Sequence, residues 1–209
     1  MTMHPHGVKY AKAFEGAPYW DGRDGRGDHV LPGETYTYQW VADEMAGPGP
    51  ADGSSVSWLY HSHDPSELDV NSGLIGCIVI TRRGEANADA TPKDVDEEFV
   101  LYLNVVDENL NYMLDRTLKE FVEDRGHPLN DTERKALKED EDFHEGNLMH
   151  GINGLLYGNL QGIDVLAGKR IRWYVFSLGS EVDLHFMHWK GHTVLYRGQR
   201  TAGVQLMAG

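Results

Sequence analysis

The chain has 209 residues, of which 40% are hydrophobic and 10% aromatic, so it can bury the core of one large domain or of two small ones. Its 33 acidic and 19 basic residues give a net charge of −14, which argues against nucleic acid or an anionic membrane as a partner. The single cysteine excludes an intrachain disulfide, and no apolar stretch is long enough to span a bilayer.

Residues 1–84 have the pattern of strands joined by turns. Thr35–Val41 is rich in β-forming residues, and Val56–His61 follows a Gly/Pro loop as a second expected strand. The apolar run Gly73–Ile80 predicts a buried strand. It contains Cys77, which we expect to pack as a small hydrophobic side chain.

Residues 85–97 are small and polar, and they are expected to link two domains. A second β region then begins with Phe99–Val106. An acidic insert, roughly Leu118 to Asp142, is compatible with helix and is expected to present its charges to solvent. The β pattern resumes at Leu148.

The last part of the chain has clear turn and strand signals. Asn153-Gly154 and Gly158-Asn159 are typical of turns. Ile171–Phe176 is expected to be a strand, and Val182–His185 is expected to open another. Short strands at regular spacing predict an all-β fold of Greek-key β-sandwiches, with a short helical insert.

Two His-X-His triplets, His4-Pro5-His6 and His61-Ser62-His63, are the main candidates for chemistry. Alternate side chains of a strand share a face, so both histidines of a triplet point the same way. Two such strands side by side would bring four imidazoles together, and neutral imidazole binds copper, zinc and iron. A further histidine cluster, from His185 through His188 to His192, lies near the C-terminus.

The residues around these histidines resemble the multicopper oxidases, and within them the ferroxidases of the ceruloplasmin and hephaestin type. The matching segments, which span nearly the whole chain, are His4–Val8, Glu15–Tyr19, Pro32–Tyr38, Tyr60–His63, Ser72–Gly76, Val106–Asn109, Met149–Gly154, Trp173–Tyr174 and Gly179–His185.

The resemblance implies linked cupredoxin-like sandwiches. We expect a first domain at residues 1–84, which lacks strands that precede His4 in the family, a linker at 85–97, and a second domain at 98–209, which lacks a C-terminal segment. The histidine strand at the start of the chain favours a fragment or a truncated form.

The resemblance also implies copper ligands. His4 would bind the type 2 copper, and His6, His61 and His63 would bind type 3 coppers. His185 would be a type 1 ligand and His188 a second type 2 ligand. The metal and catalytic candidates are therefore His4, His6, His61, His63, His185 and His188.

The sequence departs from the family pattern in two places. The next family ligand, a type 3 histidine, falls on Lys190, and a protonated lysine has no lone pair to donate. The type 1 copper needs a cysteine thiolate, which the family supplies in a later His-Cys-His segment. A type 1 copper is therefore expected only if that segment is supplied.

The ferroxidase interpretation depends on Glu145 and His150. They match the family positions that bind the ferrous substrate, and a carboxylate with an imidazole suits ferrous iron. Without the resemblance, both would be interpreted as surface residues.

The expected function is that of a copper oxidase, which couples one-electron oxidation of ferrous iron or a phenol-like substrate, as in laccases, to reduction of dioxygen to water. The alternative is a non-catalytic, cupredoxin-like structural or copper-binding module. Dioxygen, a reducing substrate and two further copies in a homotrimer are the expected partners. Family members are mostly exported, but no signal peptide is visible here, so the compartment is left open.

Overall fold

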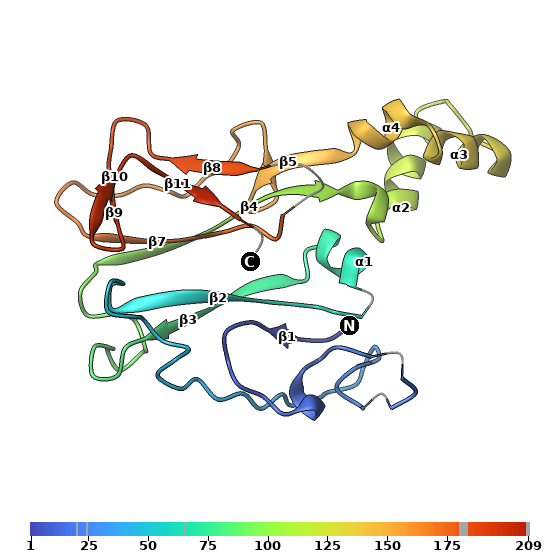
Figure 1. Ribbon diagram of the computed structural model, residues 1–209. Coiled ribbons are helices and arrows are strands. Elements are labelled where there is room, and N and C mark those ends of the chain that lie inside the picture. The colour runs from blue at the N-terminus through green and yellow to red at the C-terminus, as the bar shows by residue number, and fades with distance from the viewer. Residues whose placement is uncertain (20, 24, 65, 180–183, 208–209) are drawn as a thin grey trace.

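A computed structural model describes residues 1–19, 21–23, 25–64, 66–179 and 184–207, which form a mostly β structure with short helices gathered at one end (Figure 1). Four sheets are present among these residues, with strand orders β1-β2-β3, β6-β5-β4-β7, β11-β8 and β10-β9. The strands are β1 (His4–Pro5), β2 (Ser55–His61), β3 (Ile75–Thr81), β4 (Glu97–Asp107), β5 (Leu148–Ile152), β6 (Leu155–Leu156), β7 (Ile171–Phe176), β8 (His185–His188), β9 (Val194–Tyr196), β10 (Gln199–Thr201) and β11 (Gly203–Leu206).

The three-stranded sheet forms the lower layer in Figure 1, and the other strands lie above it. β2 and β3 pair antiparallel from Ser55↔Thr81 to His61↔Ile75, which confirms both strands expected here. The expected burial of the second strand is wrong: β3 is half-buried, and Val79 is exposed. The short helix α1 (Ser66–Asn71) lies in their connection. β1 occupies the sheet edge, where the missing N–H of Pro5 interrupts no central ladder.

The four-stranded sheet is built on β4, which pairs antiparallel with β5 and parallel with β7. The predicted turn at Asn153-Gly154 joins β5 to β6, and both residues have positive φ, 52° and 74°. Asparagine and glycine are the residues that adopt this conformation most readily, which explains the tight hairpin. β7 coincides with the predicted strand.

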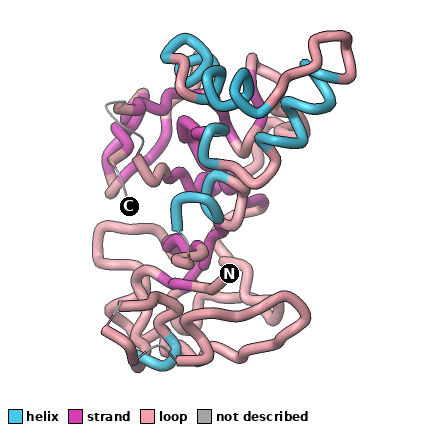
Figure 2. The backbone as a smooth tube through the Cα atoms, turned by 90° about the vertical axis from the view of Figure 1, so that its right-hand side faces the viewer, coloured by secondary structure: helices cyan, strands magenta, loops and turns pink. Residues whose placement is uncertain are grey.

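The predicted helical insert is present and extends beyond both expected ends. Figure 2 shows most of the helices at the end of the molecule opposite the N-terminal loops, whereas η1 (Lys12–Phe14) lies among those loops. The capping box of Asn130 and Glu133 starts the longest α-helix. None of its side chains is buried, as expected for a solvated charged face. The helical segments are η1 (Lys12–Phe14), α1, η2 (Glu108–Leu110), α2 (Leu114–Leu118), the π-helix η3 (Lys119–Glu123), α3 (Asp131–Lys138) and α4 (Glu141–Gly146).

The expectation of a strand at Thr35–Val41 is wrong. This segment is an extended loop, and its backbone pairing in the described chain is an isolated bridge between Lys9 and Val41. The Tyr36 and Tyr38 hydroxyls and the Trp40 indole N–H instead donate to backbone carbonyls of the 13–27 segment at 2.6 to 2.9 Å. These aromatic side chains attach one loop to another. Their β propensity therefore does not lead to a ladder of backbone hydrogen bonds with a partner strand.

A group of polar side chains, called here the polar junction, joins the lower sheet to β7. The buried Tyr174 hydroxyl hydrogen-bonds Ser55 at 2.6 Å and donates to the Glu98 carboxylate. Arg172 donates to the Ser55 hydroxyl at 2.7 Å and to Asp94 at 2.9 Å. Burial, with help from Glu98, raises the pKa of Tyr174 far above its ordinary value, so this hydroxyl keeps its proton and stays a donor.

The single cysteine lies in β3 opposite Leu59. Burial raises the pKa of Cys77 to about 11. A thiol binds metal as thiolate, so this pKa makes Cys77 a poor ligand at neutral pH. Among the described residues it joins no group of three metal-binding side chains, and it is half-buried.

The mostly β character is confirmed, while the Greek-key arrangement and the division into two domains at 85–97 stay predictions. β8 starts at His185, and Val182 and Asp183 of the strand expected there lie outside the described residues. In the described chain, no helix has the length and apolar character needed to cross a membrane.

Candidate metal centre

The two His-X-His triplets lie side by side because β1 pairs antiparallel with β2. His4 is directly opposite His61, and the His6 N–H continues the ladder by donating to the Leu59 carbonyl at 2.8 Å. His63 follows the end of β2, and its N–H donates to the Thr2 hydroxyl at 2.9 Å.

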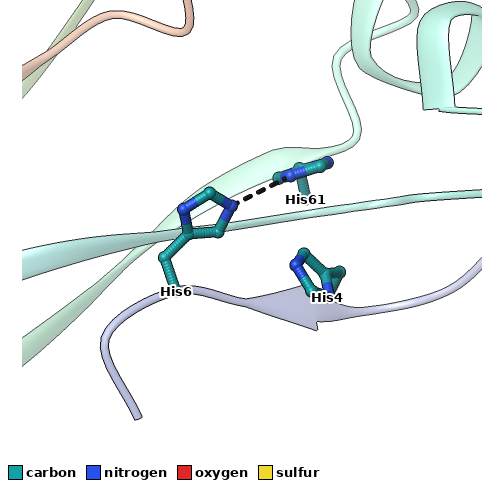
Figure 3. A group of neighbouring side chains, drawn as sticks. All are labelled: His4, His6 and His61. Carbon is teal, nitrogen blue, oxygen red and sulfur yellow. Dashed lines mark hydrogen bonds between the residues drawn. The ribbon is translucent and has the colours of Figure 1, made fainter. Parts of the chain in front are cut away.

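The four imidazoles meet in one space, as the strand pleat predicts. The His4 ring centroid lies 5.4 Å from that of His6, 5.5 Å from that of His61 and 5.2 Å from that of His63. In three of them, His4, His6 and His61, one ligand nitrogen each lies within 4.8 Å of the others (Figure 3). We call the four residues the histidine wall.

Backbone carbonyls orient two of these rings. Nδ1 of His4 hydrogen-bonds the Glu15 carbonyl at 2.8 Å, and Nδ1 of His61 hydrogen-bonds the Ser62 carbonyl at 2.8 Å. A carbonyl only accepts, so each Nδ1 carries the proton, and in a neutral ring Nε2 keeps its lone pair. The His6 and His61 Nε2 atoms face each other at 3.2 Å. Both oriented rings thus offer the nitrogen that a metal ion needs.

Two glycines permit this packing. Gly16 has φ +71°, and a Cβ there would lie 2.3 Å from the Met3 carbonyl oxygen, so only glycine lets the turn after η1 reach the edge of β1. That approach brings the Glu15 carbonyl to His4. Gly7, also at φ +71°, fits beneath the Trp58 ring.

The pKa of His6 is lowered below 6.5, mainly by burial and also by repulsion from the other imidazole rings. The pKa values of His4 and His61 are lowered as well, and burial is again the largest cause. The rings are therefore neutral at physiological pH, the form that binds metal. Because the unfolded chain protonates these histidines at a higher pH than the folded chain does, the metal-free protein should lose stability as pH falls below about 6.5.

This loss can be measured by urea unfolding at about pH 7.5 and about pH 5.5. Substitution His6→Gln removes one titrating ring, so the drop in the free energy of unfolding between the two pH values should be smaller in the variant. Carboxylates titrate in both proteins and cancel in the comparison. An equal drop would show that the wall does not couple to folding.

No family model matches the chain. Ferroxidase HEPHL1 of Homo sapiens is 39% identical over 209 residues, which cover 98% of this chain and 17% of that protein. Ceruloplasmin of Rattus norvegicus is 40% identical over 204 residues, which cover 96% of this chain and 18% of that protein. Hephaestin of Homo sapiens is 38% identical over 205 residues, which cover 96% of this chain and 17% of that protein.

The chain is a multicopper oxidase homologue of the ceruloplasmin and hephaestin type. The resemblance inferred from the motifs is thereby confirmed. The chain spans less than a fifth of the length of these relatives, 17 to 18%.

The third histidine motif of this ferroxidase homologue lies on β8, outside the sheet of the histidine wall. His185 and His188 are three residues apart in the strand, so they face opposite sides. His185 is half-buried, and its Nε2 has no hydrogen-bond partner in the described part of the chain. His188 is exposed, as is Phe186 on the same face. Lys190 is exposed in the following turn.

The two residues that resemble the iron site of ferroxidases lie on neighbouring elements. Glu145 is exposed in α4, and His150 is exposed in β5. His150 and His185 line one cavity of about 300 Å³, together with Leu103, Asn104 and Tyr157. The structure thus brings His150 to His185, whereas neither belongs to the group formed by His4, His6 and His61.

The sequence reasoning missed the residues that support the wall. Glu15 acts through a backbone carbonyl, which no side-chain pattern reveals. Thr2 and Asp69 contact Ser62 between the two ligand positions. The one available signal was the small hydroxyl residue between His61 and His63.

Proposed function

We propose that the chain forms the histidine wall of a copper-dependent ferroxidase centre, which couples oxidation of ferrous iron to reduction of dioxygen to water. The observation that carries this proposal is the convergence of His4, His6 and His61, with two Nε2 lone pairs fixed by backbone carbonyls. Ferrous iron is preferred to a phenol as substrate because one of the matched relatives, HEPHL1, is named a ferroxidase.

The residues present fit copper. The group of three contains imidazoles and no carboxylate, and nitrogen donors of this kind suit copper better than hard-oxygen metals such as magnesium. His4 is proposed for a type 2 copper, and His6, His61 and His63 for type 3 coppers. His63 extends the wall from three donors to four.

Copper held here would supply a one-electron redox couple. The balanced reaction oxidises four ferrous ions to ferric ions while one dioxygen and four protons become two waters. The work of the chain itself is to keep the rings neutral and oriented: burial favours the unprotonated form of His4, His6 and His61, and the Glu15 and Ser62 carbonyls set two of the ring tautomers.

Ferrous iron is proposed to enter near Glu145 and His150. Both side chains are exposed, so an ion can reach them, and His150 shares its cavity with His185, the proposed type 1 ligand. The net charge of −14 favours approach of a cation.

A homotrimer is proposed to complete the centre. His188, the proposed second type 2 ligand, is exposed on β8 and belongs to a different sheet from the wall. A neighbouring copy could therefore present its His188 to this wall. Sedimentation of the copper-loaded protein tests the assembly, and a monomer at micromolar concentration would exclude it.

A non-catalytic copper-binding module is the second candidate. It is favoured by Lys190 at a family ligand position and by the raised pKa of Cys77, which leaves the described chain without a ready thiolate. For a non-catalytic module we expect that the protein binds copper and takes up no oxygen.

The deciding experiment loads the chain with copper and records metal content, EPR and visible spectra, ferrous oxidation and oxygen uptake. We expect bound copper with an imidazole-type EPR signal, no intense blue band, and weak turnover at four ferrous ions per dioxygen. Oxygen uptake that His61→Ala abolishes supports the oxidase. Failure to bind copper would exclude both candidates.

A further inference from the structure

Every polar group of Ser62, the residue between two wall histidines, is engaged. Ser62 is 1% exposed. Its N–H donates to the Leu74 carbonyl at 3.0 Å, and its carbonyl accepts from Nδ1 of His61 at 2.8 Å. Its hydroxyl accepts from the Thr2 N–H at 2.9 Å and donates to Asp69. The backbone and side chain of Ser62, which joins His61 to His63, are therefore fixed by hydrogen bonds.

Asp69, on α1, sets the direction of the Ser62 hydroxyl. A hydroxyl has one proton, and here it goes to the Asp69 carboxylate, so an oxygen lone pair is left for the Thr2 N–H. Thr2 in turn holds the His63 N–H through its own hydroxyl. Removing the acceptor at Asp69 would free the Ser62 proton to turn, and both contacts to the wall would weaken.

The Asp69 carboxylate is buried, at 3% exposed, and depends on hydroxyl donors. One oxygen accepts from Ser62 and the other from the Tyr112 hydroxyl at 2.9 Å. A buried carboxylate is costly unless it is hydrogen-bonded, so loss of either donor should displace it.

Tyr112 reaches Asp69 from a segment that belongs to the four-stranded sheet's side of the chain. It follows η2, just after β4, and the residue is 54% exposed. The same segment is attached to the end of α1: the Tyr112 N–H donates to the Ser72 hydroxyl at 3.2 Å, and the Asn111 side-chain amide donates to the Asn71 carbonyl at 2.9 Å.

We propose that Asp69 is a positioning residue of the histidine wall, which fixes the Ser62 peptide between His61 and His63, and that Tyr112 connects this support to the β4 segment. This inference deepens the proposed function and rests on it for the identity of the metal. The hydrogen bonds themselves do not require a metal, so the support should be detectable in the metal-free protein.

The test compares Tyr112→Phe and Asp69→Asn with the wild type in two measurements. Histidine ring signals of the metal-free, isotope-labelled protein are recorded by NMR, and Cu(II) affinity is measured by competition titration. We expect the signals of His61 and His63 to shift, while those of the exposed His127 stay in place. Cu(II) affinity should fall by about 10-fold, the lower end of the effect of removing an outer partner of a metal ligand.

Tyr174→Phe is the matched control, because it removes a hydroxyl from the polar junction without touching Ser62. It should leave the His61 and His63 signals unchanged. Unmoved signals in Tyr112→Phe would overturn the proposal, even if Asp69→Asn fails to fold. A wild type that does not bind Cu(II) would overturn the proposed function instead, while the NMR signals still decide the positioning role.

Discussion

Replacing His61 with alanine is expected to weaken Cu(II) binding by about 100-fold or more, since loss of an outer partner alone costs about 10- to 100-fold. His61 is central to the wall: its ring centroid lies 5.2 Å from that of His6 and 5.5 Å from that of His4. Its Nε2 is also one of the two whose lone pair is fixed by a backbone carbonyl. Isothermal titration with Cu(II), followed by EPR of the bound ion, measures the effect.

His127→Ala is the control for this variant, because His127 is exposed in the segment before α3 and outside the wall. It should bind Cu(II) as the wild type does. His6→Ala gives a second reading should His61→Ala disturb β2. Equal affinity in the His61 and His127 variants would place the copper elsewhere and remove the basis of the proposed centre.

Replacing Gly7 with alanine is expected to cost about 3 kcal/mol of stability, from a left-handed backbone at roughly 1–2 kcal/mol and over-packing at roughly 1–3 kcal/mol. Gly7 has φ +71°, and an added Cβ would lie 1.9 Å from Cδ2 of Trp58. That ring cannot move freely, because its indole N–H donates to the Ala46 carbonyl at 2.6 Å. Urea unfolding followed by tryptophan fluorescence gives the value.

Gly84→Ala separates the two causes. Gly84 has φ +84°, yet a Cβ there would meet nothing within 4 Å, so only the backbone cost of about 1 kcal/mol is expected. The excess loss in Gly7→Ala then measures the contact with Trp58. If both variants lose the same stability, the close approach of Gly7 to the Trp58 ring adds no cost to the substitution.

The strands and the wall could be predicted because both depend on short-range patterns. The β-forming residues of Val56–His61 and the apolar run at Gly73–Ile80 each produced a strand, and the period of two placed both histidines of a triplet on one face. The same rule separates His185 from His188, which are three residues apart.

The features that could not be predicted depend on contacts between residues that are distant in the sequence. Thr35–Val41 has strand-forming residues, but its aromatic side chains donate hydrogen bonds to loop carbonyls and the segment has no partner strand among the described residues. The support of the wall joins Ser62 to Asp69 and Asp69 to Tyr112, 43 residues further along. A single sequence carries no signal for such a hydrogen bond, because its partners are chosen by the fold rather than by local spacing.

The polar junction limits how the lower sheet and β7 can rotate against each other. Apolar surfaces tolerate sliding, because the hydrophobic effect has no preferred direction. Hydrogen bonds weaken steeply when their angles change, and Tyr174 and Arg172 both converge on Ser55. A small twist would leave several buried polar groups unpaired at once, so the junction acts as an angular lock. The distance between the histidine wall and the cavity lined by His150 and His185, and their relative orientation, would then be set by directional hydrogen bonds and not by the length of the connecting chain.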